Sequence, residues 1–213
     1  RNVMPLKRRA VESYDAQITL CEPTLAARKS ALAEVQRETG AVLVHPYDNA
    51  RVIAGQGTAA LELLAQAELE AIITPVGGGG LLSGTCIAPR GTAPEVALYG
   101  AEPAGADDAA QSLASGELVP QLAPDTICDG LLTSLGELTW PILRDHLAGI
   151  ITVDDDAVRQ AMRLLWERME LLVEPSASIG LAAVLSPGFQ SDAQRVGVIL
   201  TGGNVDLVKF FQE

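Results

Sequence analysis

Residues 71–81 read AIITPVGGGGL, and this stretch decides the fold. A short apolar run typical of a buried strand leads into four consecutive glycines, and a helical pattern follows them. Consecutive glycines let the backbone wrap around an anion, because they lack side chains and adopt left-handed conformations freely. The N-terminus of the following helix adds free N–H groups and positive potential at the same point. The stretch predicts a strand, a phosphate-binding loop and a helix, in that order.

Outward from this stretch, short apolar runs alternate with helical segments, which is typical of βαβ units and a parallel sheet. The pattern predicts strands at 17–21, 41–45, 71–75, 95–101, 150–153 and 196–200. It predicts helices at 4–13, 23–40, 58–68, 81–88, 140–147, 155–172 and 176–185. A loop rich in turn residues at 46–57 is the expected domain crossing. We therefore expect an α/β protein with part of a small domain at 1–45 and a large domain at 46–213.

Composition and charge narrow the class of protein. The 213 residues carry a net charge of −12, with no basic stripe to hold nucleic acid or an anionic membrane. Three scattered cysteines form neither a disulfide framework nor a zinc motif, which favours a reducing compartment. No apolar run approaches the roughly 18 residues of a membrane span, and no signal peptide opens the sequence. A cytoplasmic protein is expected.

The glycine loop does not fit the common nucleotide motifs. A dinucleotide fingerprint that starts at Gly77 needs a glycine at position 82, where Leu82 stands. A triphosphate loop needs Lys-Ser or Lys-Thr after Gly84, where Thr85 and Cys86 stand. A compact monoester phosphate, such as that of pyridoxal phosphate, is the remaining natural guest. Because Glu102 ends the next strand, where a ribose-binding acid would sit, a nucleotide-binding oxidoreductase stays as an alternative.

Two further segments could bind ligands. Residues 200–206, LTGGNVD, follow the last predicted strand at the end where α/β sheets hold ligands, although a simple turn explains them equally well. Residues 102–108, EPAGADD, offer carboxylates and loop carbonyls to a hard divalent cation. On the residues alone, a solvated acidic loop is the commoner interpretation of the second segment.

Taken in order, several segments closely resemble one enzyme family, the serine racemases and biodegradative serine/threonine dehydratases of the fold-type II pyridoxal-phosphate class. The resemblance spans nearly the whole chain, and it is carried by residues 51–58, 77–80, 101–103, 129–130, 166–169, 172–177 and 201–207. It implies a three-layer, mostly parallel fold like that of the tryptophan synthase β subunit. It also implies a homodimer that racemises small hydroxy-amino acids or dehydrates them as an ammonia-lyase.

The resemblance assigns roles to individual residues. The phosphate of pyridoxal phosphate would be cradled by Gly77, Gly78, Gly79, Gly80 and the N–H of Leu81. Thr201 takes the place of a serine that faces the pyridine nitrogen, and a neutral hydroxyl there leaves that nitrogen unprotonated. Gly130 would lie beside the ring, and Glu174 would line the site. A structural Mg²⁺ or Ca²⁺ would be held by Glu102, the carbonyl of Ala106, and Asp108, which reverses the preference for a solvated loop.

One part of the family pattern is missing from the sequence. The Schiff-base lysine of the family lies in a Ser-x-Lys-x-Arg segment, and its acid/base serine in a Ser-Gly-Asn-His-Gly loop. Neither segment occurs here, and Lys7, Lys29 and Lys209 lack that context. We therefore expect the C-terminal portion of such an enzyme, an N-terminally incomplete fold without its catalytic residues. A non-catalytic relic that binds pyridoxal phosphate or another phosphate ligand is the second alternative.

Overall fold

The computed structural model describes residues 5–206. The chain divides into two compact units, one formed by residues 1–44 with 204–213 and the other by residues 45–203. Each unit is described by itself below.

The first unit contains two helices, α1 (Pro5–Glu12) and α2 (Leu25–Thr39). The side chain of Thr24 caps α2 by accepting from the N–H of Ala27, and Gly40 ends the helix with φ +69°. The strands predicted at 17–21 and 41–45 are wrong, because neither segment pairs with a strand among the described residues. Ladder hydrogen bonds, not apolar alternation alone, make a strand.

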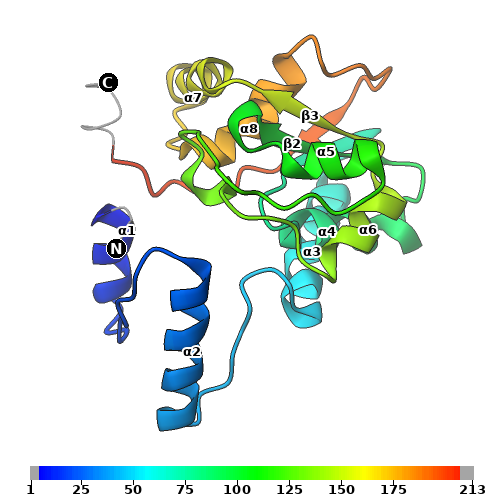
Figure 1. Ribbon diagram of the computed structural model, residues 1–213. Coiled ribbons are helices and arrows are strands. Elements are labelled where there is room, and N and C mark those ends of the chain that lie inside the picture. Colours follow the sequence, from blue (N-terminus) through cyan, green and yellow to red (C-terminus); the bar gives the residue numbers. More distant parts are fainter. Residues whose placement is uncertain (1–4, 207–213) are drawn as a thin grey trace. The chain divides into compact units, whose positions relative to one another are not determined.

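The second unit is built on a four-stranded sheet with the order β3-β2-β1-β4 (Figure 1). Its strands are β1 (Ala71–Pro75), β2 (Ala97–Pro103), β3 (Gly149–Val153) and β4 (Val196–Val198). All three pairings are parallel, with Ile73 opposite Tyr99 on one side and Val198 on the other. The parallel α/β sheet expected from the sequence is confirmed.

Helices cover both faces of this sheet. They are α3 (Ala50–Gln66), α4 (Gly80–Ile87), α5 (Asp108–Ser115), α6 (Thr139–His146), α7 (Asp155–Met169) and α8 (Pro175–Leu185). One core joins Ile72 of β1 to Leu82 of α4 and Leu143 of α6. The other joins the neighbouring Ile73 to α7 and α8. Because successive strand residues point to opposite faces, these two cores define a helix–sheet–helix sandwich of three layers.

Helix α3 begins at Ala50, eight residues before the predicted start at 58. Asn49 caps it, since its side chain accepts from the N–H groups of Arg51 and Val52. Gly57, which was assigned to the loop, serves helix packing instead. A β-carbon on Gly57 would lie 2.8 Å from the carbonyl oxygen of Gly84 in α4, so the two helices cross with their backbones in near contact. The structure also adds α5, which was not predicted within the loose stretch at 102–136.

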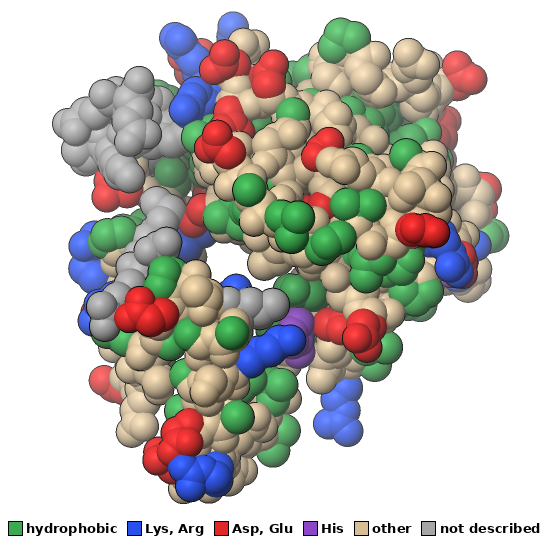
Figure 2. Space-filling view, viewed as in Figure 1, with side chains coloured by type: hydrophobic (Ala, Val, Ile, Leu, Met, Phe, Trp, Pro, Cys, Tyr) green, Lys and Arg blue, Asp and Glu red, His purple; other side chains and the backbone are tan. Residues whose placement is uncertain are grey.

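Acidic side chains are dispersed over the surface. On the face shown in Figure 2, Asp and Glu alternate with apolar and neutral patches, and the described Lys and Arg side chains form no continuous stripe there. No helix within residues 5–206 has both the length and the hydropathy of a membrane span.

Candidate functional site

The glycine loop lies at the carboxyl end of β1, where parallel sheets hold ligands. Gly77 and Gly79 have φ angles of +53° and +85°, which L side chains rarely adopt. The N–H of Gly79 donates to the carbonyl of Val76 at 3.0 Å, which closes the turn directly before α4. Helix α4 has no side-chain cap, so its first N–H groups are left for an anion.

Two side chains from distant segments hold the loop in this shape. The ring of Tyr47 lies against Gly78, where an added β-carbon would be 2.4 Å from ring atoms. The β-carbon of Tyr47 lies against Gly80, where an added β-carbon would be 2.8 Å from it. Thr139, which is fully buried, donates its hydroxyl proton to the carbonyl of Gly78 at 2.9 Å. The Thr139 oxygen also accepts from the N–H of Gly136 at 2.8 Å. With Tyr47 on one side and Thr139 on the other, the loop itself has room only for glycines.

Asp48, next to Tyr47, binds the start of α6. Its two carboxylate oxygens accept from the N–H groups of Leu138 at 2.8 Å and Glu137 at 3.2 Å. These are two of the donors that a helix N-terminus leaves free, and a carboxylate also complements the helix dipole there. The segment 47–48 therefore fixes both the glycine loop and the helix that carries Thr139.

The structure brings three other predicted segments to the glycine loop. A β-carbon on Gly77 would lie 3.3 Å from the carbonyl oxygen of Gly130, and one on Gly130 would lie 3.9 Å from a carboxylate oxygen of Glu174. One on Gly202 would lie 3.2 Å from the same oxygen. The N–H of Glu174 donates to the carbonyl of Gly202 at 2.9 Å. Gly77, Gly130, Glu174 and Gly202 therefore form a continuous arc of neighbouring residues.

Gly130 is held in this arc by hydrogen bonds from two helices. Its N–H donates to the hydroxyl of Ser176, in the first turn of α8, at 2.9 Å. Asp155, in the first turn of α7, accepts from the Thr126 hydroxyl at 2.5 Å and from the Ile127 N–H at 2.9 Å. The segment 126–131 is therefore tied to the framework at both ends.

The remaining two residues of the predicted cofactor site flank the arc. Thr201 directly precedes Gly202 and is exposed, so its hydroxyl is accessible. Leu81 is half-buried in the first turn of α4, one residue beyond the glycines. Both lie within the second unit, as do all the other predicted cofactor ligands.

The predicted metal ligands lie at the end of β2. Glu102 is 1% exposed, and its carboxylate accepts from the N–H groups of Ala109 at 3.2 Å and Ala110 at 2.9 Å. Burial raises the pKa of Glu102 to about 8 and that of Asp108 to about 6. One oxygen of Asp108 is buried without a hydrogen-bond partner, and Ala106 is buried beside it. The described residues include no group of three or more Asp, Glu, His or Cys side chains that could hold a metal ion, so this set rests on two carboxylates and a carbonyl.

Sequence reasoning missed Tyr47, Asp48, Thr139, Ser176 and Asp155. None of them belongs to a motif with fixed spacing, and each acts on a segment far away in the chain. A local signal existed for three of them, since Thr139, Ser176 and Asp155 stand in the first turn of a helix, where such residues are favoured. This local signal predicted where the helices begin, but not which distant residues these side chains would bind.

A parallel sheet with a glycine loop at its carboxyl edge and this arc of converging segments defines a fold-type II pyridoxal-phosphate enzyme. The chain belongs to the family of pyridoxal-phosphate dependent enzymes, whose model matches residues 1–202. This membership implies pyridoxal phosphate as the cofactor and decides against a nucleotide-binding oxidoreductase.

Individual relatives are serine racemases and dehydratases. The chain is 49% identical over 207 residues to serine racemase of Dictyostelium discoideum, an alignment that covers 95% of this chain and 64% of that protein. It is 44% identical over 210 residues to beta-hydroxyaspartate dehydratase of Paracoccus denitrificans, covering 98% of this chain and 67% of that protein. The structure of maize serine racemase matches with a TM-score of 0.96 and 44% identity, covering 100% of this chain and 66% of that one.

Proposed function

We propose that this chain carries the cofactor-binding part of an enzyme that dehydrates or racemises small hydroxy-amino acids. The arc of Gly77, Gly130, Glu174 and Gly202 carries the proposal, because it joins four separate segments at the carboxyl edge of one sheet. Relatives named as racemases and as dehydratases support both reactions. The chain spans only 64% of the Dictyostelium relative, so the activity concerns the protein to which these residues contribute.

The residues present fit pyridoxal phosphate. Gly77–Gly80 leave no room for side chains, because added β-carbons would meet Leu131, Tyr47 and Thr139, and the loop leads into the uncapped N-terminus of α4. The N–H groups of this loop and of Leu81 would hold the phosphate. When bound, the cofactor supplies a sink for the electron pair released with the substrate's α-proton.

Other residues would orient the cofactor ring. The hydroxyl of Thr201 would face the ring nitrogen and leave it neutral, while Gly130 offers a surface without a side chain next to the ring. Glu174 presents its carboxylate between Gly130 and Gly202, where it would meet the ring or the substrate. A homodimer, as implied by the family resemblance, remains part of the proposal.

We also propose a structural Mg²⁺ or Ca²⁺ at Glu102, the Ala106 carbonyl and Asp108. The donor set is all oxygen, as these hard cations prefer. The partnerless buried oxygen of Asp108 is the supporting observation, since buried carboxylates are normally paired or bound to a metal. The cation would fix the end of β2 against α5. Added Ca²⁺ should raise the melting temperature, and the Asp108→Asn protein should lose this response.

The experiment for the main proposal uses the purified full-length protein to which these residues contribute, together with pyridoxal phosphate. We expect visible absorption that borohydride bleaches, followed by formation of D-serine or of pyruvate from L-serine, each measured by chromatography. Thr201→Ser should retain activity, whereas Thr201→Val should keep the bound phosphate but alter the cofactor spectrum. Turnover that requires a nicotinamide cofactor, or no binding of pyridoxal phosphate, would contradict the proposal.

A further inference from the structure

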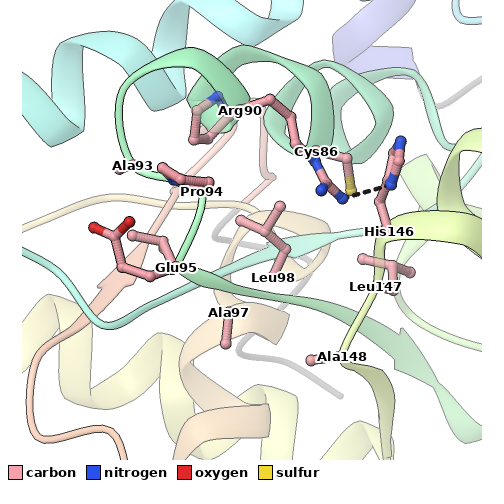
Figure 3. Close-up of a pocket in the computed structure, with 12 residues that line it drawn as sticks. Cys86, Arg90, Ala93, Pro94, Glu95, Ala97, Leu98, His146, Leu147 and Ala148 are labelled. Carbon is pink, nitrogen blue, oxygen red and sulfur yellow. Dashed lines mark hydrogen bonds between the residues drawn. The ribbon is translucent and has the colours of Figure 1, made fainter.

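A cavity lies at the amino ends of the parallel strands, opposite to the end that carries the glycine loop. It has a volume of about 280 Å³ and is bounded by the end of α4, the 3-10 turn Ala88–Gly91 (η1), the start of β2 and the end of α6 (Figure 3). Leu98 lines it near the amino end of β2, whereas the glycine loop follows the carboxyl end of the parallel strand β1. This cavity is therefore separate from the proposed cofactor site.

Arg90 and His146 meet at one side of this cavity. A guanidinium nitrogen of Arg90 contacts Nδ1 of His146 at 2.5 Å, although 56 residues separate the two in the chain (Figure 3). Since a guanidinium only donates, Nδ1 of His146 is the acceptor in this contact. Within residues 5–206 no carboxylate forms an ion pair with Arg90. The remaining N–H groups of the guanidinium are thus free to bind an incoming anion.

Most of the other residues that line the cavity have apolar side chains, although backbone polar atoms are also accessible in it. Leu98 is 5% exposed and Cys86 is fully buried, and Ala93 and Leu147 complete the apolar lining. Burial raises the pKa of the Cys86 thiol to about 12, so Cys86 adds no charge at neutral pH. The exposed Glu95 stands at the side of the cavity away from Arg90 and His146 (Figure 3). One end of the cavity therefore offers donors to an anion, and the rest suits a short apolar group.

We propose that this cavity binds a small monocarboxylate with a short apolar chain, such as a 2-oxo acid or an apolar amino acid. Arg90 and His146 would share the carboxylate through charge-assisted hydrogen bonds, which replace the weaker contact between the two basic groups. The apolar chain would cover Leu98 and Leu147. The carboxylate of Glu95 repels a second negative group, which selects against phosphates and nucleotides. The inference goes beyond the proposed function and stands whether or not that function holds.

The test is a titration of the protein, saturated with pyridoxal phosphate, with 2-oxobutanoate. Methyl resonances of Leu98 and Leu147 should shift together and report one dissociation constant. Arg90→Gln should raise that constant by about tenfold or more, as expected for the loss of a charge-assisted hydrogen bond. Arg144→Gln is the matched control, because Arg144 lies on the same helix as His146 but pairs with Asp145 outside the cavity. It should leave the constant unchanged.

Further arms separate the remaining outcomes. His146→Gln should weaken binding as well, which keeps the test valid if Arg90→Gln does not fold. The neutral amide of 2-oxobutanoate should not bind. Equal binding of inorganic phosphate or ATP at these methyl groups would overturn the assignment to monocarboxylates. Shifts confined to Leu131, beside the glycine loop, would show that 2-oxobutanoate binds only there and would overturn the second site.

Discussion

The ring of Tyr47 lies flat against the backbone of Gly78, so close that a β-carbon on Gly78 would fall 2.4 Å from the ring carbon Cγ. Real β-carbon contacts are never this short, and either the ring or the loop would have to shift. Position 78 therefore admits only glycine while Tyr47 keeps its place. The contact joins the first residues of the second unit to the loop that would carry the phosphate.

Gly78→Ala should therefore lower both stability and affinity for the cofactor. We expect the free energy of unfolding to fall by about 1–3 kcal/mol, as for other overpacked sites. Urea denaturation measures this change, and fluorescence titration with pyridoxal phosphate measures the affinity. Gly91→Ala is the control, because nothing lies within 4 Å of its added β-carbon. The double variant Tyr47→Ala/Gly78→Ala should recover part of the loss, and a loss unaffected by Tyr47 would refute the steric account.

The crossing of α3 and α4 predicts a contrast between two glycines. In Gly84→Ala the β-carbon would lie 2.4 Å from the carbonyl oxygen of Ile53 and 2.5 Å from the backbone nitrogen of Gly57. Backbone atoms cannot turn aside, so the helices must separate, at a cost of about 3 kcal/mol in unfolding free energy. Gly55→Ala, within α3, meets nothing within 4 Å and should stabilise the helix by about 0.5–1 kcal/mol. Thermal and urea unfolding of both variants decide the matter, and equal effects would contradict it.

Asp155→Ala should release the segment that carries Gly130. Two hydrogen bonds to a carboxylate are lost, from Thr126 and Ile127, so the free energy of unfolding should fall by about 2 kcal/mol. Amide hydrogen exchange of residues 126–131 should accelerate, and affinity for pyridoxal phosphate should drop. Asp156→Ala removes a carboxylate from the same first helical turn, so it controls for the helix dipole. If both variants exchange at the same rate, Asp155 does not position the segment.

The sequence predicted correctly those structural features that depend on residues close together in the chain. The strand at 71–75, the glycine loop and α4 follow from local apolar pattern and backbone freedom, and the structure confirms them. Gly57 was interpreted as a loop residue because its role is tertiary, a close approach of α3 to α4. Strand formation at 17–21 and 41–45 failed for a similar reason, since a strand depends on a partner that local sequence does not specify.

The candidate site shows the same division. Gly77–Gly80 could be found from the run of glycines alone, and Thr201 lay in a segment, 200–206, that a simple turn explained equally well. The places of Gly130 and Glu174 were inferred only through family resemblance. No sequence rule links Tyr47 to Gly78 or Asp48 to Leu138, because these contacts depend on how distant segments pack. The roles of Gly130, Glu174 and Thr201 in binding the cofactor, and of Glu102 and Asp108 in binding a metal, are proposals with their own experiments.

The buried thiols predict how stability changes with pH. Burial raises the pKa of Cys86 and Cys128 to about 12. The unfolded thiols ionise near pH 9 while the folded ones stay protonated, so the unfolded state loses protons first. Stability is therefore fully present below about pH 9 and falls as pH rises from about 9 toward about 12. Urea denaturation between about pH 8 and about pH 10.5 measures this slope.

Cysteine variants test whether the thiols cause that slope. Cys86→Ala and Cys128→Ala should each flatten it, whereas Cys21→Ala, at a half-buried position, should not. Ellman's reagent at mildly alkaline pH should label Cys86 and Cys128 only after unfolding. Rapid labelling of either thiol in the native protein would refute the burial that underlies the prediction.

The two segments of the first unit that were predicted as strands affect how the protein can be handled in solution. Val42 and Val44 are 86% and 68% exposed, and Leu20 is 55% exposed, all on backbone that forms no ladder among the described residues. Exposed apolar side chains on a backbone without ladder hydrogen bonds favour association with another chain. In concentrated solution, the protein should aggregate through these residues and not through the well-packed sheet, and turbidity measures this aggregation. Replacing Val42 by lysine is the simplest way to keep the protein dispersed for spectroscopy.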